Sequence, residues 1–154
     1  MMRTRATSPT PTPLLFLDYD GVLHPASPPF KEFCCAERLA LSLQGLSCDI
    51  VISSSWRFHR SPSALTQGLP AALRQRVVGT TGAAYVGRWA RYEEINAWRH
   101  EHSPLAPWRA LDDARLEFPK GCAEVIWCNP TTGLCDRVAR ELRDWLVAVQ
   151  VELP

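Results

Sequence analysis

Short, unbroken runs of apolar residues recur along the chain, and several of them lead directly into polar residues. A run of this kind is typical of a strand that a parallel sheet buries on both faces. The expected strands lie at residues 14–17 (LLFL), 48–56 (apolar at 50–52), 77–87 (a short strand and a glycine-bearing loop), 108–111 (WRAL) and 124–128 (EVIWC).

Apolar residues at helical spacing predict amphipathic helices between these strands, over residues 31–46, 91–102 and 134–150. A further helix is expected to start after Ser61, with Pro62 in its first position, and to break at Gly68 and Pro70. Strands that alternate with helices predict an α/β fold, with a doubly wound, Rossmann-like parallel sheet in three layers.

Length and composition indicate an ordinary globular chain. The 154 residues are 46% apolar and 21% charged, which predicts one domain with a substantial core over residues 14–154. Residues 1–13 are rich in Thr, Ser and Pro and predict a disordered tail, with a trimmed targeting peptide as a weaker alternative. The net charge of +1 indicates no field that would attract a nucleic acid or a membrane, although local basic patches remain compatible with it.

Cysteine usage and hydropathy bear on the compartment. The six cysteines form no CxxC pair, and their spacing fits no zinc framework. No apolar stretch is long enough to span a membrane, so no membrane partner is expected. Without a recognisable secretion signal, reduced thiols in a cytoplasmic protein are the simplest interpretation, with Cys48 and Cys128 as small buried apolar residues.

Polar residues follow three of the expected strands at the point where each strand ends. Asp18 and Asp20 follow the first, Ser53–Ser55 the second, and Asp112-Asp113 the fourth. The carboxyl ends of parallel strands share one edge of the sheet, where ligands bind in open α/β folds. The sequence therefore predicts that these groups converge on one site.

Four carboxylates at one edge would repel one another unless a positive charge lay among them. Mg²⁺ suits a few carboxylates together with water and a phosphate, so a magnesium site is the leading hypothesis. Alone, the motif Asp18-Tyr19-Asp20-Gly21 is also compatible with an ordinary turn. Its coincidence with the serine run and the aspartate pair favours the functional interpretation.

These motifs carry a resemblance to a known family. FLDYDGVL, VISSSWR and LDD together resemble the haloacid dehalogenase (HAD) superfamily of phosphohydrolases and phosphotransferases. From about Leu14 onward the chain resembles the small HAD domains of RNA-repair proteins of the Swiss Army Knife type. Weaker shared signals are the segment Arg91–Ile95 with Trp98, and Gly133-Leu134 before the last helix.

The resemblance implies a role for each motif residue. Asp18 would be the nucleophile that forms an aspartyl phosphate, and Asp20 the general acid and base. Asp18, the backbone carbonyl of Asp20 and Asp112 would hold Mg²⁺, with Asp113 in direct or water-mediated support. Gly21 would let the backbone approach the phosphate.

The resemblance also requires a hydroxyl and a cation for the phosphoryl group. Ser53 is the first choice for the hydroxyl and Ser54 the second. Arg91 is the expected cation, with Arg88 as its rival, while Arg57 is expected to contact substrate. Against this stands the general observation that most arginines are solvated surface charges.

Other conspicuous residues are expected to be structural. The four tryptophans considered are expected to pack in the core rather than stack on bases: Trp56, Trp98, Trp127 and Trp145. His24 and His59 are expected to be solvated although they follow functional stretches, and Glu93 and Glu94 to be helix-surface acids.

The short connections leave no room for an inserted cap domain, so an open site is expected. An open site favours a phosphate on a large molecule, such as an RNA or DNA end, and the RNA-repair resemblance points the same way. The sequence shows no arginine-aromatic array that would independently indicate RNA binding. The alternatives are a non-catalytic domain that binds phosphate ends and a phosphotransferase with an acceptor other than water. The oligomeric state stays open.

Overall fold

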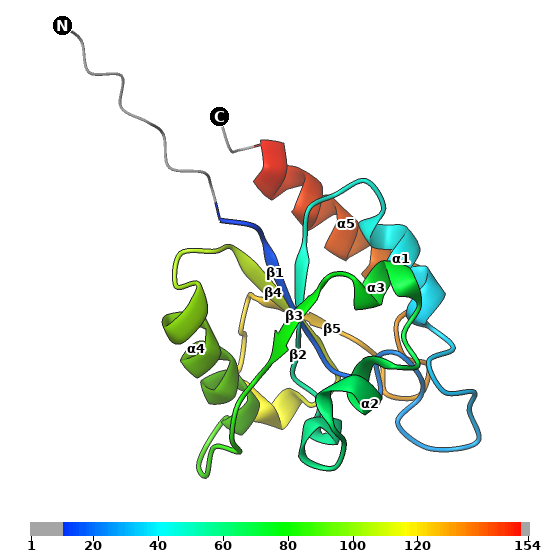
Figure 1. Ribbon diagram of the computed structural model, residues 1–154, viewed down its shortest axis with the longest axis horizontal. Coiled ribbons are helices and arrows are strands. Elements are labelled where there is room, and N and C mark those ends of the chain that lie inside the picture. The colour runs from blue at the N-terminus through cyan, green and yellow to red at the C-terminus, as the bar shows by residue number, and fades with distance from the viewer. Residues whose placement is uncertain (1–10, 152–154) are drawn as a thin grey trace, which may run out of the picture.

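The sheet has five parallel strands in the order β3-β2-β1-β4-β5. The computed structural model describes residues 11–151 of the chain (Figure 1). The strands are β1 (Leu14–Leu17), β2 (Asp49–Ile52), β3 (Val77–Thr80), β4 (Trp108–Asp112) and β5 (Val125–Trp127). Because β1 pairs with both β2 and β4, the strand order reverses at β1, and the crevice beyond its carboxyl end is the expected ligand site.

Helices cover both faces of the sheet, which confirms the predicted α/β architecture. The α-helices are α1 (Ala36–Leu43), α2 (Pro62–Thr66), α3 (Ala71–Arg74), α4 (Ala90–His102) and α5 (Asp136–Val151), with two 3₁₀ turns, η1 (Ser55–Phe58) and η2 (Arg115–Glu117). Side chains of α1, α2, α3 and α5 contribute to one apolar cluster, whereas α4 contributes to the other (Figure 1).

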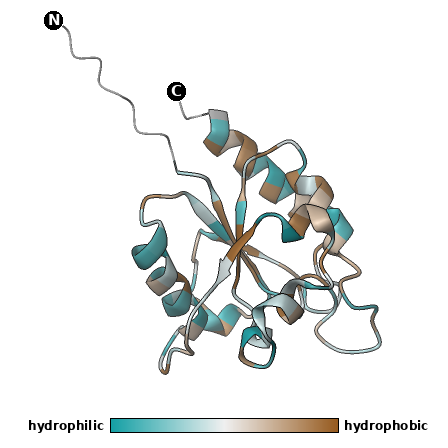
Figure 2. Ribbon diagram, in the orientation of Figure 1, coloured by the Kyte–Doolittle hydropathy of each residue, from teal (hydrophilic) through white to brown (hydrophobic). Residues whose placement is uncertain are grey.

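The central strand β1 divides its side chains between the two clusters. Leu15 and Leu17 belong to the cluster under α1 and α5, and Leu14 and Phe16 to the cluster under α4. All four are buried, so an unbroken apolar run is what this position requires (Figure 2). Phe16 packs edge-on against two indoles, with ring centroids 5.8 Å from Trp98 and 5.7 Å from Trp108.

Several local predictions are confirmed. The Ser61 hydroxyl accepts a hydrogen bond from the Ala64 N–H (3.2 Å) and caps α2, with Pro62 in the first position. The predicted break separates α2, which ends at Thr66, from α3, which begins after Pro70. The four tryptophans named above are partly buried, and each packs against one of the two clusters.

Helix α1 is shorter than predicted. The expected helix began at residue 31, but α1 begins at Ala36, and residues 32–35 form turns. Phe33 has a φ of 58°, in the left-handed region, which a right-handed helix cannot accommodate. The apolar side chain of Phe33 fits the helical spacing, yet Phe33 lies in a turn, from which it packs against the cluster under α1 and α5.

The connections between strands contain no additional domain. The segment between β1 and β2 is a loop and α1, and the segment between β2 and α4 is filled by η1, α2, α3 and β3. The absence of a cap is therefore confirmed for residues 11–151. Most of the predicted tail, residues 1–13, lies outside the described residues, so the proposed division of the chain stays a prediction. Among the helices of residues 11–151, none has the length and apolar character that crossing a bilayer requires.

Replacing Phe16 tests the packing between the sheet and α4. We expect Phe16→Ala to lower the free energy of unfolding by about 3–5 kcal/mol, because a large cavity would remain between two tryptophans. Val86→Ala is the matched control: the Val86 side chain is 94% exposed, so we expect a change of no more than about 0.5 kcal/mol. Urea unfolding followed by circular dichroism measures both, and equal midpoints would contradict the assignment.

Candidate active site

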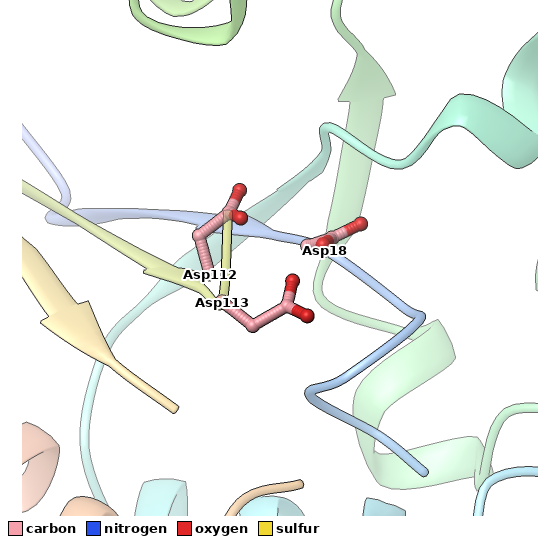
Figure 3. Close-up of side chains that lie close together, drawn as sticks. All are labelled: Asp18, Asp112 and Asp113. Atoms are coloured by element: carbon pink, nitrogen blue, oxygen red, sulfur yellow. The ribbon is translucent and has the colours of Figure 1, made fainter. Parts of the chain in front are cut away.

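Three carboxylates meet at the carboxyl edge of the sheet. Asp18 follows β1, Asp112 ends β4, and Asp113 is the next residue (Figure 3). One oxygen from each lies within 4.8 Å of the others. The register explains this meeting: Leu17 pairs with Leu111, and the Asp18 N–H donates to the Leu111 carbonyl (3.2 Å). Phe16 and Ala110 belong to the cluster under α4, and since successive side chains alternate between faces, Asp18 and Asp112 both point toward the α4 side.

Burial makes these charges costly. The pKa of Asp18 is raised well above its usual value, first by burial and then by the negative charge of Asp112. Burial also raises the pKa of Asp112 and that of Asp113. The site therefore favours any positive charge that can lie among the three groups.

Arg91, in the first turn of α4, supplies one such charge. Its Nη1 lies 3.1 Å from Asp18 Oδ2 and 2.9 Å from Asp112 Oδ2. Burial lowers the pKa of Arg91, but the two carboxylates outweigh that effect and raise it overall. Arg88, the rival predicted from the sequence, is exposed, and its guanidinium carbon lies 4.4 Å from the centre of the Trp89 ring. The structure thus brings Arg91, and not Arg88, to the carboxylates.

Asp20 lies outside this three-carboxylate group. Its Oδ1 is 2.8 Å from His24 Nε2, and its Oδ2 accepts a hydrogen bond from Trp56 Nε1 (3.0 Å). Its side chain is 45% exposed, so it is held by two protein groups and still accessible from solvent. The side chain is not among the grouped carboxylates, and a metal contact through the backbone carbonyl stays a prediction.

His24 corrects an expectation, because it is fully buried rather than solvated. Its ring stacks on Phe30 at 4.5 Å with an interplanar angle of 3°. The Phe33 N–H points at Nδ1 (3.3 Å), so Nδ1 accepts, and in the neutral ring the proton is on Nε2, which donates to Asp20. The sequence carried a signal for this contact, since His24 lies four residues after Asp20.

Gly21 is required by the approach of Asp113. Its φ of 76° lies in the left-handed region, and a Cβ at this position would overlap the Asp113 carboxylate. The glycine therefore lets the loop after Asp20 close over the aspartate pair. Any other residue would push apart the two segments that form the site.

The serine run divides into two roles. Ser53 is buried, and its hydroxyl contacts no hydrogen-bonding partner among the described residues. The Ser54 hydroxyl accepts from the Trp56 N–H (3.2 Å) and caps η1, so it is committed to the local turn. Thr81, which the sequence analysis overlooked, follows β3 as Ser53 follows β2, and within residues 11–151 its buried hydroxyl is also unpaired.

Arg57 and Glu94 form a buried ion pair, which corrects the expectation that Glu94 is a helix-surface acid. Arg57 Nη2 lies 3.0 Å from Glu94 Oε1, and the two side chains are only 5% and 8% exposed. The Arg57 guanidinium also donates to the carbonyls of Ser54 (3.0 Å) and Gly82 (3.1 Å). Burial lowers the pKa of Arg57, and Glu94 opposes that shift. Arg57 therefore joins the loops after β2 and β3 to helix α4, and its expected contact with substrate stays a prediction. Glu94 is no surface acid.

Comparison with family models identifies the chain. Residues 14–139 match the model described as the HAD domain in Swiss Army Knife RNA repair proteins. The chain belongs to this family. The match spans all five strands and all the residues of the site described above. The resemblance to this family, which the sequence analysis based on three short motifs, is therefore confirmed over residues 14–139. Searches of curated proteins and of solved structures each found no match.

The residues of the HAD domain fit a divalent cation. HAD domains typically use Mg²⁺, a hard ion that takes oxygen ligands, including carboxylates. Asp18, Asp112 and Asp113 offer three such oxygens, and their raised pKa values show that Arg91 does not fully offset the cost of burying these charges together. A bound cation would relieve that cost.

Asp113→Asn tests the electrostatic cost of the site. The pKa of Asp113 is raised in the folded state, so its ionised form at pH 7 lowers the stability, and this penalty is lost as the pH falls through the folded-state pKa toward the lower pKa of the unfolded chain. In the presence of a chelator at pH 7, we expect the variant to melt about 2 °C higher than the wild type. On addition of Mg²⁺ we expect a smaller gain in melting temperature than the wild type shows.

Asp144→Asn serves as the matched control, because Asp144 is exposed on α5. It should follow the wild type with and without Mg²⁺ in differential scanning fluorimetry. An unchanged Mg²⁺ response in Asp113→Asn would contradict the participation of Asp113 in a cation site.

Proposed function

We propose that this HAD domain is a Mg²⁺-dependent phosphatase that hydrolyses a phosphomonoester through a phosphate ester of Asp18. The observation that carries the proposal is that Asp18 lies beside Asp112 and Asp113 with Arg91 in contact, while Asp20 is held separately two residues away. A domain that only binds phosphate needs positive charge and donors, and has no use for four carboxylates around one crevice. A phosphatase that uses an aspartate nucleophile and a second aspartate as acid and base needs two carboxylates in different surroundings, as Asp18 and Asp20 are.

In the first step, an Asp18 carboxylate oxygen attacks phosphorus and the bond from phosphorus to the ester oxygen breaks. Asp20 in its protonated form gives its proton to the departing oxygen. Bound Mg²⁺ would lower the repulsion between the Asp18 carboxylate and the phosphoryl oxygens. We expect the Arg91 guanidinium, whose Nη1 lies 3.1 Å from Asp18 Oδ2, to donate to the same phosphoryl oxygens.

In the second step, the Asp20 carboxylate takes a proton from a water molecule, whose oxygen attacks phosphorus. The bond between phosphorus and the Asp18 oxygen breaks, which releases inorganic phosphate and restores Asp20 as an acid. The His24 and Trp56 donors hold the Asp20 carboxylate in one orientation for both steps. The unpaired Ser53 hydroxyl supports the proposal, because a phosphoryl oxygen would satisfy it.

The proposed substrate is the phosphate at the end of a nucleic acid, in the first place RNA. Two observations support it: the connections around the site contain no cap domain, and the matched family is described from RNA repair proteins. An uncapped site accepts a phosphate on a chain too large to be enclosed.

Asp18→Asn tests the nucleophile. An amide cannot form the phosphate ester, so we expect hydrolysis of p-nitrophenyl phosphate with Mg²⁺ to fall by at least about 10³-fold. Asp144→Asn should keep wild-type activity. Equal activity of Asp18→Asn and the wild type would exclude the mechanism, whereas wild-type binding of phosphate ends without turnover under any divalent metal would indicate a binding domain instead.

Asp20→Asn tests the acid. A nitrophenolate leaves without a proton, whereas an alkoxide needs one, so we expect kcat/KM to fall about 10²–10⁴-fold on an alkyl phosphate and far less on p-nitrophenyl phosphate. Trp56→Phe removes one donor to Asp20 and should show the same selectivity, with about a tenfold larger loss on the alkyl substrate. Trp145→Phe, which changes a partly buried indole on α5, is the control. Equal losses of kcat/KM on both substrates would indicate that Trp56 acts only through packing.

A further inference from the structure

A cavity of about 490 Å³ opens between the start of α4, η2 with the loop that follows it, and the end of β5. Figure 1 shows η2 and its loop beside the first turn of α4. The volume lies in the range of about 300–1,000 Å³ that is typical of small-ligand sites. The residues that matter for its chemistry are Arg88, Trp89, Arg115, Phe118, Lys120 and Trp127.

The cavity adjoins the active site through both of its walls. On one side, Trp127 is the register partner of Asp112, so the two residues occupy neighbouring positions at the same edge of the sheet. On the other side, Trp89 directly precedes α4, which carries Arg91 in its first turn. The Arg91 N–H donates to Glu117 Oε2 (3.3 Å), which links the start of α4 to η2.

The lining combines cations with flat aromatic rings. Three of the nine lining residues are cationic and none is acidic. The guanidinium carbon of Arg88 lies 4.4 Å from the centre of the Trp89 ring, and that of Arg115 lies 4.8 Å from the centre of the Trp127 ring. No local sequence pattern indicates this arginine-aromatic array, because residues 115 and 127 join residues 88–89 only in the folded chain.

We propose that this basic aromatic pocket, defined by Arg88, Trp89, Arg115, Lys120 and Trp127, binds the unpaired nucleotide next to the terminal phosphate of a single-stranded nucleic acid. The inference rests on the proposed function and adds a place for the strand beyond the phosphate. A base has a flat face that stacks on an indole or a guanidinium, and the neighbouring phosphates are anions that Arg115 and Lys120 can pair with.

Charge and shape together favour this occupant. A basic peptide would be repelled by three cations with no acid among the lining residues. An acidic phosphopeptide would match the charge but would bring no flat base to stack on the guanidinium groups that lie over Trp89 and Trp127. A base-paired end would keep its bases stacked inside the duplex, so the pocket selects unpaired ends.

Binding of labelled RNA tests the pocket without turnover. The probe is a single-stranded RNA octamer with a terminal phosphate and a fluorophore at the other end, measured by anisotropy in the presence of a chelator. We expect Arg115→Ala and Lys120→Ala to weaken binding about tenfold each and to make the affinity less dependent on salt. Arg140→Ala, an exposed arginine on α5, should bind like the wild type.

Arg115→Lys separates stacking from charge. Lysine keeps the positive charge but has no planar group to lie between Trp127 and a base. We expect the affinity of Arg115→Lys for the octamer to depend on salt as the wild-type affinity does, but to be several-fold weaker than that of the wild type. In turnover assays, the loss of kcat/KM for Arg115→Ala should be at least fivefold larger on the RNA than on p-nitrophenyl phosphate.

The outcomes separate this inference from the proposed function. If Arg115→Ala and Lys120→Ala bind the octamer as the wild type does, the pocket assignment is wrong even where the phosphatase is active. If an acidic phosphopeptide binds more tightly than the octamer and responds to the same substitutions, the nucleic-acid assignment is wrong. If the wild type shows no turnover but the pocket variants lose RNA binding, the pocket stands and the phosphatase proposal fails.

Discussion

Mutual repulsion among buried carboxylates is the constraint on which this structure depends. Asp18, Asp112 and Asp113 lie within 4.8 Å of one another at the edge of the sheet, and burial raises the pKa of each. The parallel register of β1 and β4 imposes their proximity, since the backbone hydrogen bonds that pair the strands also set the spacing of the residues that follow. Arg91 offsets part of the repulsion, and a divalent cation would offset more.

The surrounding residues keep the reactive groups apart and fixed. Asp20 is turned toward His24 and Trp56 and away from the three grouped carboxylates, which separates a proton-transfer group from a nucleophile two residues away. Arg57 ties the loops after β2 and β3 to Glu94 on α4. Since Arg91 precedes Glu94 on that helix by three residues, this buried ion pair also fixes the depth at which Arg91 enters the site.

Much of the fold followed from the sequence, because short apolar runs buried on both faces leave few alternatives to a parallel sheet. The residues at strand ends were predictable for the same reason: Asp18, Ser53 and Asp112 each follow an apolar run, and parallel strands bring their carboxyl ends together. Arg91 was the expected cation, although only the structure shows that it reaches the carboxylates and that Arg88 lines the neighbouring cavity instead.

What the sequence did not reveal depends on contacts between distant segments. His24 and Glu94 resemble surface residues in the sequence, and their burial results from Phe30 stacking on one and Arg57 pairing with the other. The start of α1 was placed too early because Phe33 fits helical spacing while its backbone is left-handed. The pairing of Arg115 with Trp127 joins residues on two separate elements, which no local pattern records.

Helix α4 is the one α-helix among residues 11–151 whose side chains build the apolar cluster on its face of the sheet, and this has a consequence for how the protein tolerates change. Ile95 of this helix is buried in the cluster, Glu94 pairs with Arg57, and Arg91 contacts the site carboxylates. Arg88 and Trp89, just before the helix, line the basic aromatic pocket. Because these four roles belong to one short helix and the residues just before it, a change in one of them affects the others. A small rotation of α4 would disturb both the packing of Ile95 and the position of Arg91. Sequence variation should therefore accumulate on the other face of the sheet, where α1, α2, α3 and α5 all contribute to the apolar cluster.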